Sequence, residues 1–269
     1  MLDDAMLETL RRRAFDLRLD SLNAVAAAES GHPGGTLSAI DLLQALYFVE
    51  MKHRPKEPHW PERDRFVLSK GHAAPALYSV LAHAGYFSTD LLPSLRRLGS
   101  PLQGHPVNFL LPGVEASTGS PGQGLSVAVG MALAAKLDGS AARIYTLIGD
   151  GESQQGQIWE AALCAPKYAL DNLCVILDHH DAREPLAERW RAFDFDVRTI
   201  DGHDYQQIAG AFDAARAAQG KPALIVAETV EGKGVSFMEN QRASDGVAPN
   251  KEQLAQAIAE LRAAQPEPA

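Results

Sequence analysis

The sequence has little of what marks a secreted, membrane-bound or nucleic-acid-binding protein. Its only cysteines are Cys164 and Cys174, both in apolar stretches, so we expect reduced core residues and a cytoplasmic location. No run of about 18 apolar residues occurs, and the first residues carry no apolar signal core, so neither a membrane span nor a signal peptide is expected. Acidic residues outnumber basic ones by 34 to 25, which argues against nonspecific binding to nucleic acids or anionic membranes. Small molecules or other proteins are therefore the expected partners.

The remaining composition is that of an ordinary globular protein. With 269 residues, 46% of them hydrophobic and 22% charged, the chain can bury one large core. Strand and helix patterns alternate from a helix at residues 4–29 to a closing helix at residues 251–264, without internal repeats or a linker. This alternation predicts an α/β fold, with a doubly wound, mainly parallel sheet flanked by helices, as a single domain over residues 1–269. Residues 264–269 are expected to form a frayed tail.

The stretch at residues 143–181 predicts a ligand site. A β-rich run ends at Gly149-Asp150-Gly151, a helical segment follows, and a second apolar run stops at Asp178-His179-His180-Asp181. The carboxyl ends of parallel strands lie at the same edge of a sheet. Asp150 and the second cluster should therefore share one rim, where such folds bind ligands.

Three histidines stand in glycine-containing loops. His32 and His105 each lie between a glycine and a proline, and His72 follows a glycine just before a helical segment. For each histidine alone, a capping or surface role is the simpler interpretation. Because Gly and Pro fix a backbone close to a ligand, the three together favour a functional role.

A Gly/Ser-rich loop leads into an almost wholly apolar helix that includes residues 125–135. Free backbone N–H groups at the start of this helix could bind an anion, although a glycine-rich turn is a weak signal. The helix is predicted either to lie buried in the core of a monomer or to form a subunit interface, since periodicity does not separate the two.

Seven motifs, in this order, resemble the diphosphate-binding domain of transketolase: SGHPGG, SKGHAAPALY, LQGHP, STGSPGQGLSVAVGMALAAK, GDGESQQGQIWEA, DGHD and EGKGVSFMEN. The resemblance covers nearly the whole chain. It implies thiamine diphosphate and a divalent cation, Mg²⁺ or Mn²⁺, as cofactors, and transfer of a two-carbon ketol unit from a ketose to an aldose. The length resembles that of the amino-terminal subunit of a split transketolase. That implies a carboxyl-terminal partner subunit with the pyrimidine-binding domain, a heterotetramer, and a sugar or sugar-phosphate substrate.

The resemblance also assigns roles to individual positions. The implied catalytic residues are His32, His105 and His72: His32 and His105 would contact the ketose hydroxyls and help to move protons, and His72 would lie near the cofactor diphosphate. Asp150 and His180 stand at the positions of the side-chain metal ligands. The cofactor-binding positions implied by the motifs are His72, Gly119, Gly149, Asp150, Gly151, Gln155 and Asp245.

Several of these positions depart from the family pattern. His180 replaces an asparagine, and imidazole favours a transition metal over Mg²⁺. The loop after Asp181 is shortened, Gln155 replaces a glutamate, and Pro121 replaces a leucine. Asp245 replaces the histidine of a Trp-His-Gly motif, and its carboxylate would repel a diphosphate.

Two hypotheses are consistent with these departures. The first is a thiamine-diphosphate-dependent transketolase subunit with an altered metal preference or an unusual substrate. The second is a transketolase-like subunit that has lost ordinary thiamine diphosphate binding, and that serves as a structural or regulatory partner or performs different chemistry.

Overall fold

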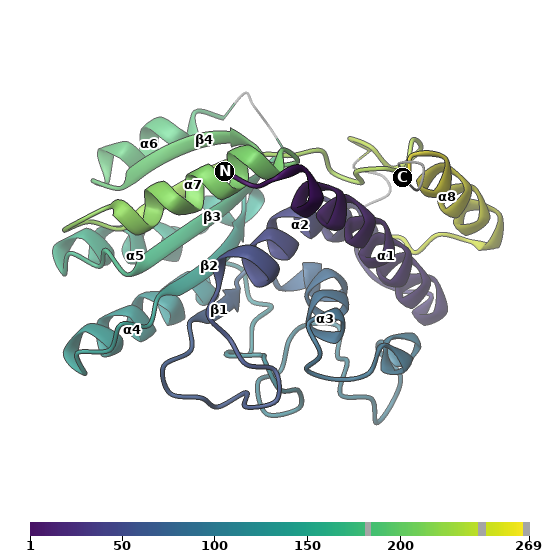
Figure 1. Cartoon of the computed structure of the whole chain (residues 1–269), viewed down its shortest axis with the longest axis horizontal. Helices are drawn as coiled ribbons and strands as arrows, with labels where there is room; N and C mark the ends of the chain where they lie inside the picture. Colours follow the sequence, from purple (N-terminus) through teal and green to yellow (C-terminus); the bar gives the residue numbers. More distant parts are fainter. Residues whose placement is uncertain (181–183, 242–245, 266–269) are drawn as a thin grey trace.

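The structure, a computed structural model, describes residues 1–180, 184–241 and 246–265. Its sheet contains five strands: β1 (Arg65–Leu68), β2 (Ile144–Gly149), β3 (Leu173–His179), β4 (Asp196–Asp201) and β5 (Ala223–Glu228). They are ordered β1-β2-β3-β5-β4, and all neighbouring pairs are parallel. The predicted doubly wound α/β fold is therefore confirmed (Figure 1).

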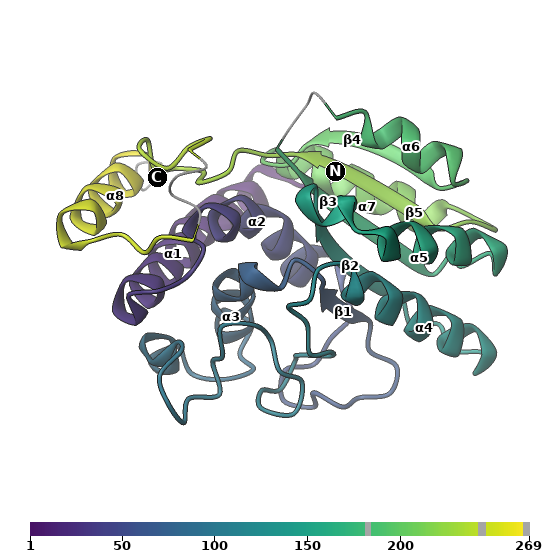
Figure 2. The ribbon, with the colours of Figure 1, turned by 180° about the vertical axis from the view of Figure 1, so that it is seen from behind.

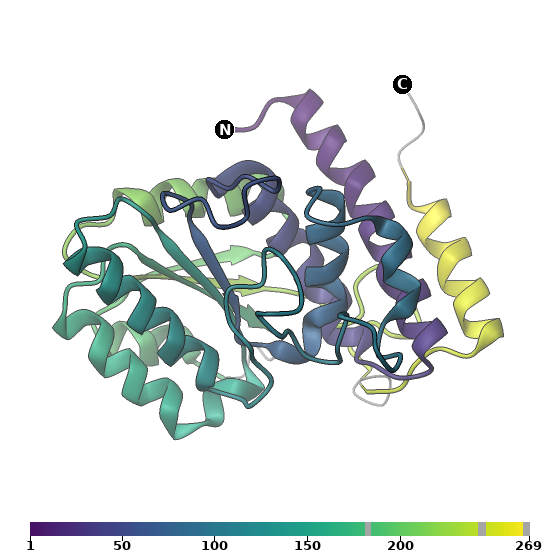
Figure 3. The ribbon, with the colours of Figure 1, turned by 90° about the horizontal axis from the view of Figure 1, so that it is seen from below.

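Helices cover both faces of the sheet, as Figures 1 and 2 show. On one face lie α1 (Asp4–Ala28), α2 (Pro33–Ala45), α3 (Ala74–His83) and α7 (Tyr205–Ala217); on the other lie α4 (Gln123–Leu137), α5 (Gly156–Lys167) and α6 (Leu186–Ala192). The last helix, α8 (Lys251–Ala263), packs beside α1 at the edge of the molecule (Figure 3). Short helical turns occur at Leu46–Glu50, Gly71–Ala73, Thr89–Ser94 and Gly151–Gln154.

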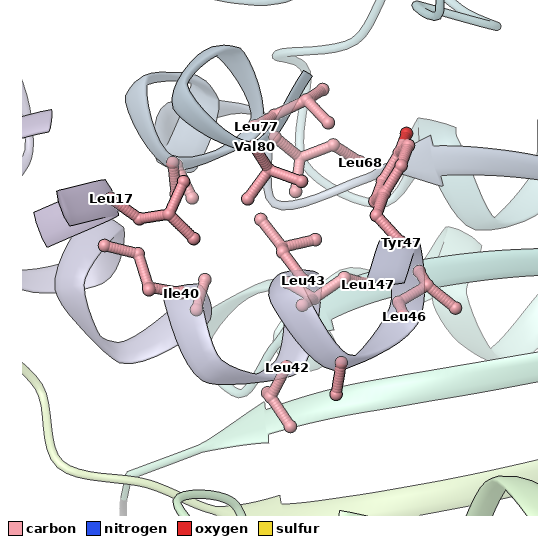
Figure 4. Packing of buried hydrophobic residues seen from close by; sticks show 14 of the residues in the cluster. Leu17, Ile40, Leu42, Leu43, Leu46, Tyr47, Leu68, Leu77, Val80 and Leu147 are labelled. Atoms are coloured by element: carbon pink, nitrogen blue, oxygen red, sulfur yellow. The ribbon is translucent and has the colours of Figure 1, made fainter. Parts of the chain in front are cut away.

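The central strand β3 shows why its sequence is a continuous apolar run. Cys174 and Ile176 point into the core under α2, whereas Val175 and Leu177 point into the core under α4 and α5. A strand buried on both faces has no need for polar alternation. Figure 4 shows the core on the side of the sheet that α2 covers, where Ile40 and other residues of α2 pack against α1 and α3. Both cysteines are free, as predicted, and burial raises the pKa of Cys174 to about 12.

The apolar helix predicted at residues 125–135 forms most of α4. Leu125, Ala128 and Ala132 face the sheet and are buried. Its outer side leaves Val127 and Leu137 exposed in this single chain, Leu137 to 79%. The helix is thus a half-buried core helix, and its outer apolar side is open to a partner.

The carboxyl ends of the strands form the rim that the sequence predicts. In the β2–β3 pair, Gly149 lies opposite Asp178, and the Asp150 N–H donates to the Asp178 carbonyl oxygen at 3.3 Å. Strand β3 runs two residues beyond the predicted run, so Asp178 and His179 are strand residues and both are buried. Among the described residues, no helix is long and apolar enough to cross a membrane.

Candidate functional site

A cavity of about 280 Å³ lies at this rim. Its walls come from the loops that follow β1, β2, β3 and β5 and from the loop before α4. The cavity gathers most of the predicted cofactor and metal positions: His72, Gly119, Gly149, Asp150, Gly151, Gln155 and His180. Pro121 also lines it. The predicted cofactor position Asp245, and residues 181–183 of the shortened loop, lie outside the described residues.

Behind the cavity, Asp178 is fully buried, and both of its carboxylate oxygens accept hydrogen bonds. Its Oδ2 accepts from Lys70 Nζ and from Ser38 Oγ, each at 2.8 Å, and its Oδ1 accepts from the Thr229 hydroxyl. Burial alone would raise the pKa of Asp178, but the positive charges of Lys70 and His180 hold this pKa well below its usual range. The Lys70 ammonium is consequently already paired before any ligand enters.

Asp150 lies nearer the opening of the cavity, against His180. One carboxylate oxygen accepts from the Gly151 N–H at 2.7 Å, and the other accepts from the His180 N–H at 3.0 Å. The imidazole of His180 stands between two carboxylates, with Nδ1 3.7 Å from Asp150 Oδ2 and Nε2 3.2 Å from Asp178 Oδ1. Burial lowers the pKa of His180, but Asp178 and Asp150 outweigh that effect and raise it to about 9.

These side chains do not make a metal site by themselves. Among the described residues, no group of three or more His, Cys, Asp or Glu side chains is arranged to hold a metal ion. Asp178 already accepts hydrogen bonds from Lys70, Ser38 and Thr229, which leaves the carboxylate of Asp150 and, once it has lost its proton, the imidazole of His180. Mg²⁺ bound with a diphosphate usually takes one or two carboxylates, phosphate oxygens and water. The donor set fits a divalent cation that arrives with a diphosphate, and does not fit a cation held by protein ligands alone.

The backbone around the cavity leaves room for such a ligand. A Cβ atom placed on Gly151 would meet no atom of the described residues within 4 Å, so the space above this residue is open. Gly119 is more constrained, because its φ is +138° and a Cβ there would lie 2.8 Å from His105 Cγ. A glycine at position 119 therefore lets the backbone of the α4 loop approach His105.

The three predicted histidines come from separate loops and meet beside the cavity. The rings of His32 and His72 have centroids 5.1 Å apart, and His105 packs on Gly119. Burial lowers the pKa of His105, and the nearby charges of Arg96 and His32 lower it further. The structure thus places these three side chains close to one another, at the edge of the same pocket; their individual roles stay predictions.

Two carboxylates of the cavity were missed in the sequence. Glu152 is buried and accepts from the Ser69 hydroxyl and the Gly122 N–H, the latter at 2.6 Å, so it joins three of the pocket loops. Burial raises the pKa of Glu152, although these hydrogen bonds oppose the change. Glu231, in the loop after β5, also lines the cavity. The available signal was their position in the Gly-Asp-Gly and Gly-Lys-Gly motifs.

The DGHD motif builds a second network, away from this cavity. His203 Nδ1 lies 2.7 Å from Asp41 Oδ2, and its Nε2 accepts from the Val230 N–H at 2.9 Å. Asp41 also pairs with Arg18 and accepts from the Tyr205 hydroxyl. Because Val230 precedes Glu231, this network holds the loop that forms one wall of the cavity.

Comparison with known proteins identifies the family. The chain matches the transketolase, thiamine diphosphate binding domain over residues 10–267. It belongs to the transketolase family and is a transketolase-type transferase subunit.

Two relatives are subunits of about the same length. The 6-deoxy-6-sulfo-D-fructose transketolase subunit SqwG from a Clostridium species is 45% identical over 263 residues, which cover 94% of this chain and 96% of that protein. An apulose-4-phosphate transketolase subunit from Actinobacillus succinogenes is 39% identical over 263 residues, with coverages of 94% and 95%. The predicted correspondence to a split-transketolase subunit is confirmed.

Solved structures confirm the fold. Transketolase from Campylobacter jejuni superposes with a TM-score of 0.89 at 38% identity over 94% of this chain and 42% of that one. Transketolase from Leishmania mexicana gives a TM-score of 0.89 at 32% identity over 94% and 41%. The chain therefore spans about two fifths of these longer transketolases.

Proposed function

We propose that the chain is the amino-terminal subunit of a split transketolase. It would transfer a two-carbon ketol unit from a ketose to an aldose with thiamine diphosphate, in a complex with a carboxyl-terminal subunit that carries the pyrimidine-binding domain. The main support is the convergence of His32, His72 and His105 beside a cavity at the sheet rim. The full-length match to two transketolase subunits supports the need for a partner.

Within this proposal, each part of the pocket has its own task. When bound, thiamine diphosphate supplies the electron sink for breaking the carbon–carbon bond beside the ketose carbonyl. His32 and His105 would orient the sugar hydroxyls and hold or accept a proton at those oxygens. His72 and the backbone of Gly119 and Gly151 would border the cofactor. Gly149 and Gln155 complete the proposed cofactor-binding set in the cavity, with Asp245 added from the family motif.

The proposal also assigns the cation. Asp150 would be the principal protein ligand of Mg²⁺ or Mn²⁺, with the diphosphate and water supplying most of the other ligands. The pocket favours this joint arrangement because Asp150, Glu152 and Glu231 all line it, whereas Lys70 is paired to Asp178. A bare diphosphate would be repelled by these carboxylates. His180 is a candidate ligand that favours Mn²⁺ or another transition metal.

The outer face of α4 and the two subunit relatives support the proposed assembly. Two copies of each subunit would form a heterotetramer, with apolar residues such as Val127 and Leu137 in an interface. We propose that residues 1–269 form one diphosphate-binding domain and act in the cytoplasm. The relatives named for 6-deoxy-6-sulfo-D-fructose and apulose-4-phosphate suggest a sugar with an anionic end as substrate.

One observation favours the second candidate, a diverged subunit without ordinary thiamine diphosphate binding. The imidazole of His180 lies between Asp150 and Asp178, in the region where the family places a metal ligand. If this arrangement persists when the cofactor is offered, the chain would serve as a structural or regulatory partner or perform different chemistry.

An activity assay on the reconstituted pair separates the two candidates. The chain is co-purified with a carboxyl-terminal transketolase subunit, and ketol transfer is followed with thiamine diphosphate and Mg²⁺ or Mn²⁺. Loss of a positioned acid–base side chain usually lowers a rate by about 10²- to 10⁴-fold, so His32→Ala and His105→Ala should lower kcat in that range. The exposed His59 gives a matched control, His59→Ala, with unchanged turnover. Absence of turnover with any ketose donor would favour the second candidate.

A further inference from the structure

Arg96 has an unusual backbone in the loop that leads to His105. Its φ is +59°, in the left-handed region that residues other than glycine seldom occupy. The loop closes on itself there, because the Arg96 N–H donates to the Leu102 carbonyl oxygen at 2.8 Å. Such a conformation costs free energy of order 1–3 kcal/mol and persists only where the surroundings enforce it.

The side chain of Arg96 touches two of the histidine loops. Its Nη1 donates to Ser30 Oγ at 2.8 Å, two residues before His32. Its guanidinium lies against Gly104, where an added Cβ would be 3.0 Å from Arg96 Nε. Arg96 Nε is buried and has no hydrogen-bond partner among the described residues, and it lies directly against the Gly104 backbone. The guanidinium therefore bridges the backbone segments that carry His32 and His105.

Tyr78 connects the loop of His105 to the helix that follows His72. It belongs to α3, the helix that follows His72, and its hydroxyl lies 2.9 Å from the Gln103 carbonyl oxygen and 3.2 Å from that of His105. Tyr78 is buried and can donate its single proton to either carbonyl. The loop of His105 is thus held from two sides, by α3 and by Arg96.

We propose that Arg96 is a positioning residue that holds the loop of His105 against the loop of His32, and so sets the spacing of the two histidines assigned to the sugar. The inference rests on the proposed function only where turnover is measured. Its structural part, a guanidinium beside His105, stands on the contacts of Arg96 with Ser30 and Gly104.

The charge of Arg96 gives a readout that does not depend on cofactor or activity. The groups that act on the His105 imidazole are Arg96 and His32, together with partial burial, and all three favour its neutral form. Removing the guanidinium charge should therefore raise the midpoint of the His105 titration. A purely mechanical role in folding would leave that midpoint unchanged.

The experiment compares Arg96→Gln, Arg96→Lys and the control Arg97→Gln, since Arg97 is the exposed neighbour of Arg96 on the same loop. The imidazole C–H resonance of His105 is assigned by its loss in His105→Asn and titrated by NMR. Removal of a nearby like charge should raise the His105 midpoint in Arg96→Gln by about half a pH unit. Arg96→Lys and Arg97→Gln should keep the wild-type midpoint.

Turnover of the reconstituted pair supplies the second readout. Both Arg96 variants should lower kcat for ketol transfer by about tenfold, because lysine lacks the planar fork that spans two loops. KM for thiamine diphosphate should stay unchanged, since Arg96 does not line the cavity. An inactive wild-type pair would count against the proposed function and leave the NMR result to decide on Arg96. A wild-type His105 midpoint in Arg96→Gln would overturn the inference. If Arg96→Gln unfolds, Arg96→Lys decides through turnover, and an unchanged kcat in that variant would overturn it.

Discussion

Two buried carboxylates of this molecule have similar partners and different surroundings. Asp41 pairs with Arg18 at 2.6 Å and with His203 at 2.7 Å, and Asp178 pairs with Lys70 at 2.8 Å. Both also accept hydrogen bonds from hydroxyl groups. The histidines differ: both nitrogens of His203 make hydrogen bonds, whereas Nε2 of His180 is buried 3.2 Å from Asp178 Oδ1 without the alignment of a hydrogen bond to any residue that the structure describes.

This difference separates a structural ion pair from a candidate functional one. The Asp41 network also borders a cavity, of about 290 Å³, but both nitrogens of His203 have partners there, and the network holds the loop at Val230 in place. The Asp178 network stands behind a cavity, and its neighbour His180 faces both Asp178 and Asp150 with an incomplete set of hydrogen bonds. Buried polar groups are normally satisfied, so an unsatisfied imidazole beside a cavity indicates a place where a ligand or cation changes the contacts.

The largest expected effect comes from breaking the structural network. Arg18→Met leaves the charge of Asp41 buried without its guanidinium partner, and removing one member of a buried ion pair typically costs about 3–5 kcal/mol. The free energy of unfolding, measured in urea, should fall by that amount. The exposed pair of Arg54 and Glu57 gives the control, because Arg54→Ala should cost less than about 1 kcal/mol. If Arg18→Met and Arg54→Ala lose the same free energy of unfolding, the ion pair of Arg18 with Asp41 is no more important for stability than an exposed pair.

The next effect concerns the pH dependence of stability. The folded state raises the pKa of His180 to about 9 from a usual 6.5, so the imidazolium contributes stability that is fully present below pH 6.5 and is lost as the pH rises through 9. One pKa unit corresponds to about 1.4 kcal/mol, which puts the whole loss at about 3 to 4 kcal/mol. Urea unfolding between pH 6 and pH 10, in wild type and His180→Asn, checks this.

The variant His180→Asn shows whether His180 causes the pH dependence of stability. Asparagine does not titrate, so the free energy of unfolding of His180→Asn should vary less between pH 6.5 and pH 9. If wild type and variant lose stability in parallel over this interval, the ion contacts of His180 with Asp150 and Asp178 are not its source.

A smaller effect is expected on ligand binding by the same variant. His180→Asn places an amide oxygen at the proposed ligand position and removes the imidazole from between the two carboxylates. Mg²⁺-dependent binding of thiamine diphosphate should become tighter by about tenfold, the lower end of the effects seen for changes around metal ligands. Unchanged affinity, measured by calorimetry on the assembled pair, would show that His180 neither binds nor excludes the cation.

The smallest effect is expected at Glu231. Glu231→Gln removes one of the carboxylates that line the cavity. In a solvated pocket the repulsion between two charges is about 1 kcal/mol, so the affinity for thiamine diphosphate should rise by up to about fivefold. Glu228→Gln, at the exposed end of β5, is the matched control and should change nothing. Weaker binding in Glu231→Gln would mean that this carboxylate helps to hold the cofactor.

The sequence was sufficient to predict the fold and the rim of the sheet at which the cavity lies. The alternation of strand and helix is a local property, and the ends of β2 and β3 follow from where the apolar runs stop. That placed Asp150 beside the end of β3, as the register of Gly149 with Asp178 confirms. The glycine-containing loops likewise indicated that His32, His72 and His105 belong together.

The interactions that close the site were not predictable in the same way. Asp178 was expected in an open ligand cluster, yet it is locked by Ser38 and Thr229, which lie 140 and 51 positions away in the chain. Such pairs depend on how helices pack over the sheet, and no local pattern records them. Glu152 was missed for a similar reason, since its partners Ser69 and Gly122 come from other loops.

The proposed function requires that this pocket bind thiamine diphosphate and a divalent cation together when the partner subunit is present. Calorimetric titration of thiamine diphosphate into the assembled pair, with Mg²⁺, with Mn²⁺ and with a chelator, tests it most directly. We expect heat of binding with either cation, and none with the chelator, because Asp150, Glu152 and Glu231 would repel a bare diphosphate. If no heat of binding is measured under any of these conditions, the pocket does not bind thiamine diphosphate and the proposed function is wrong.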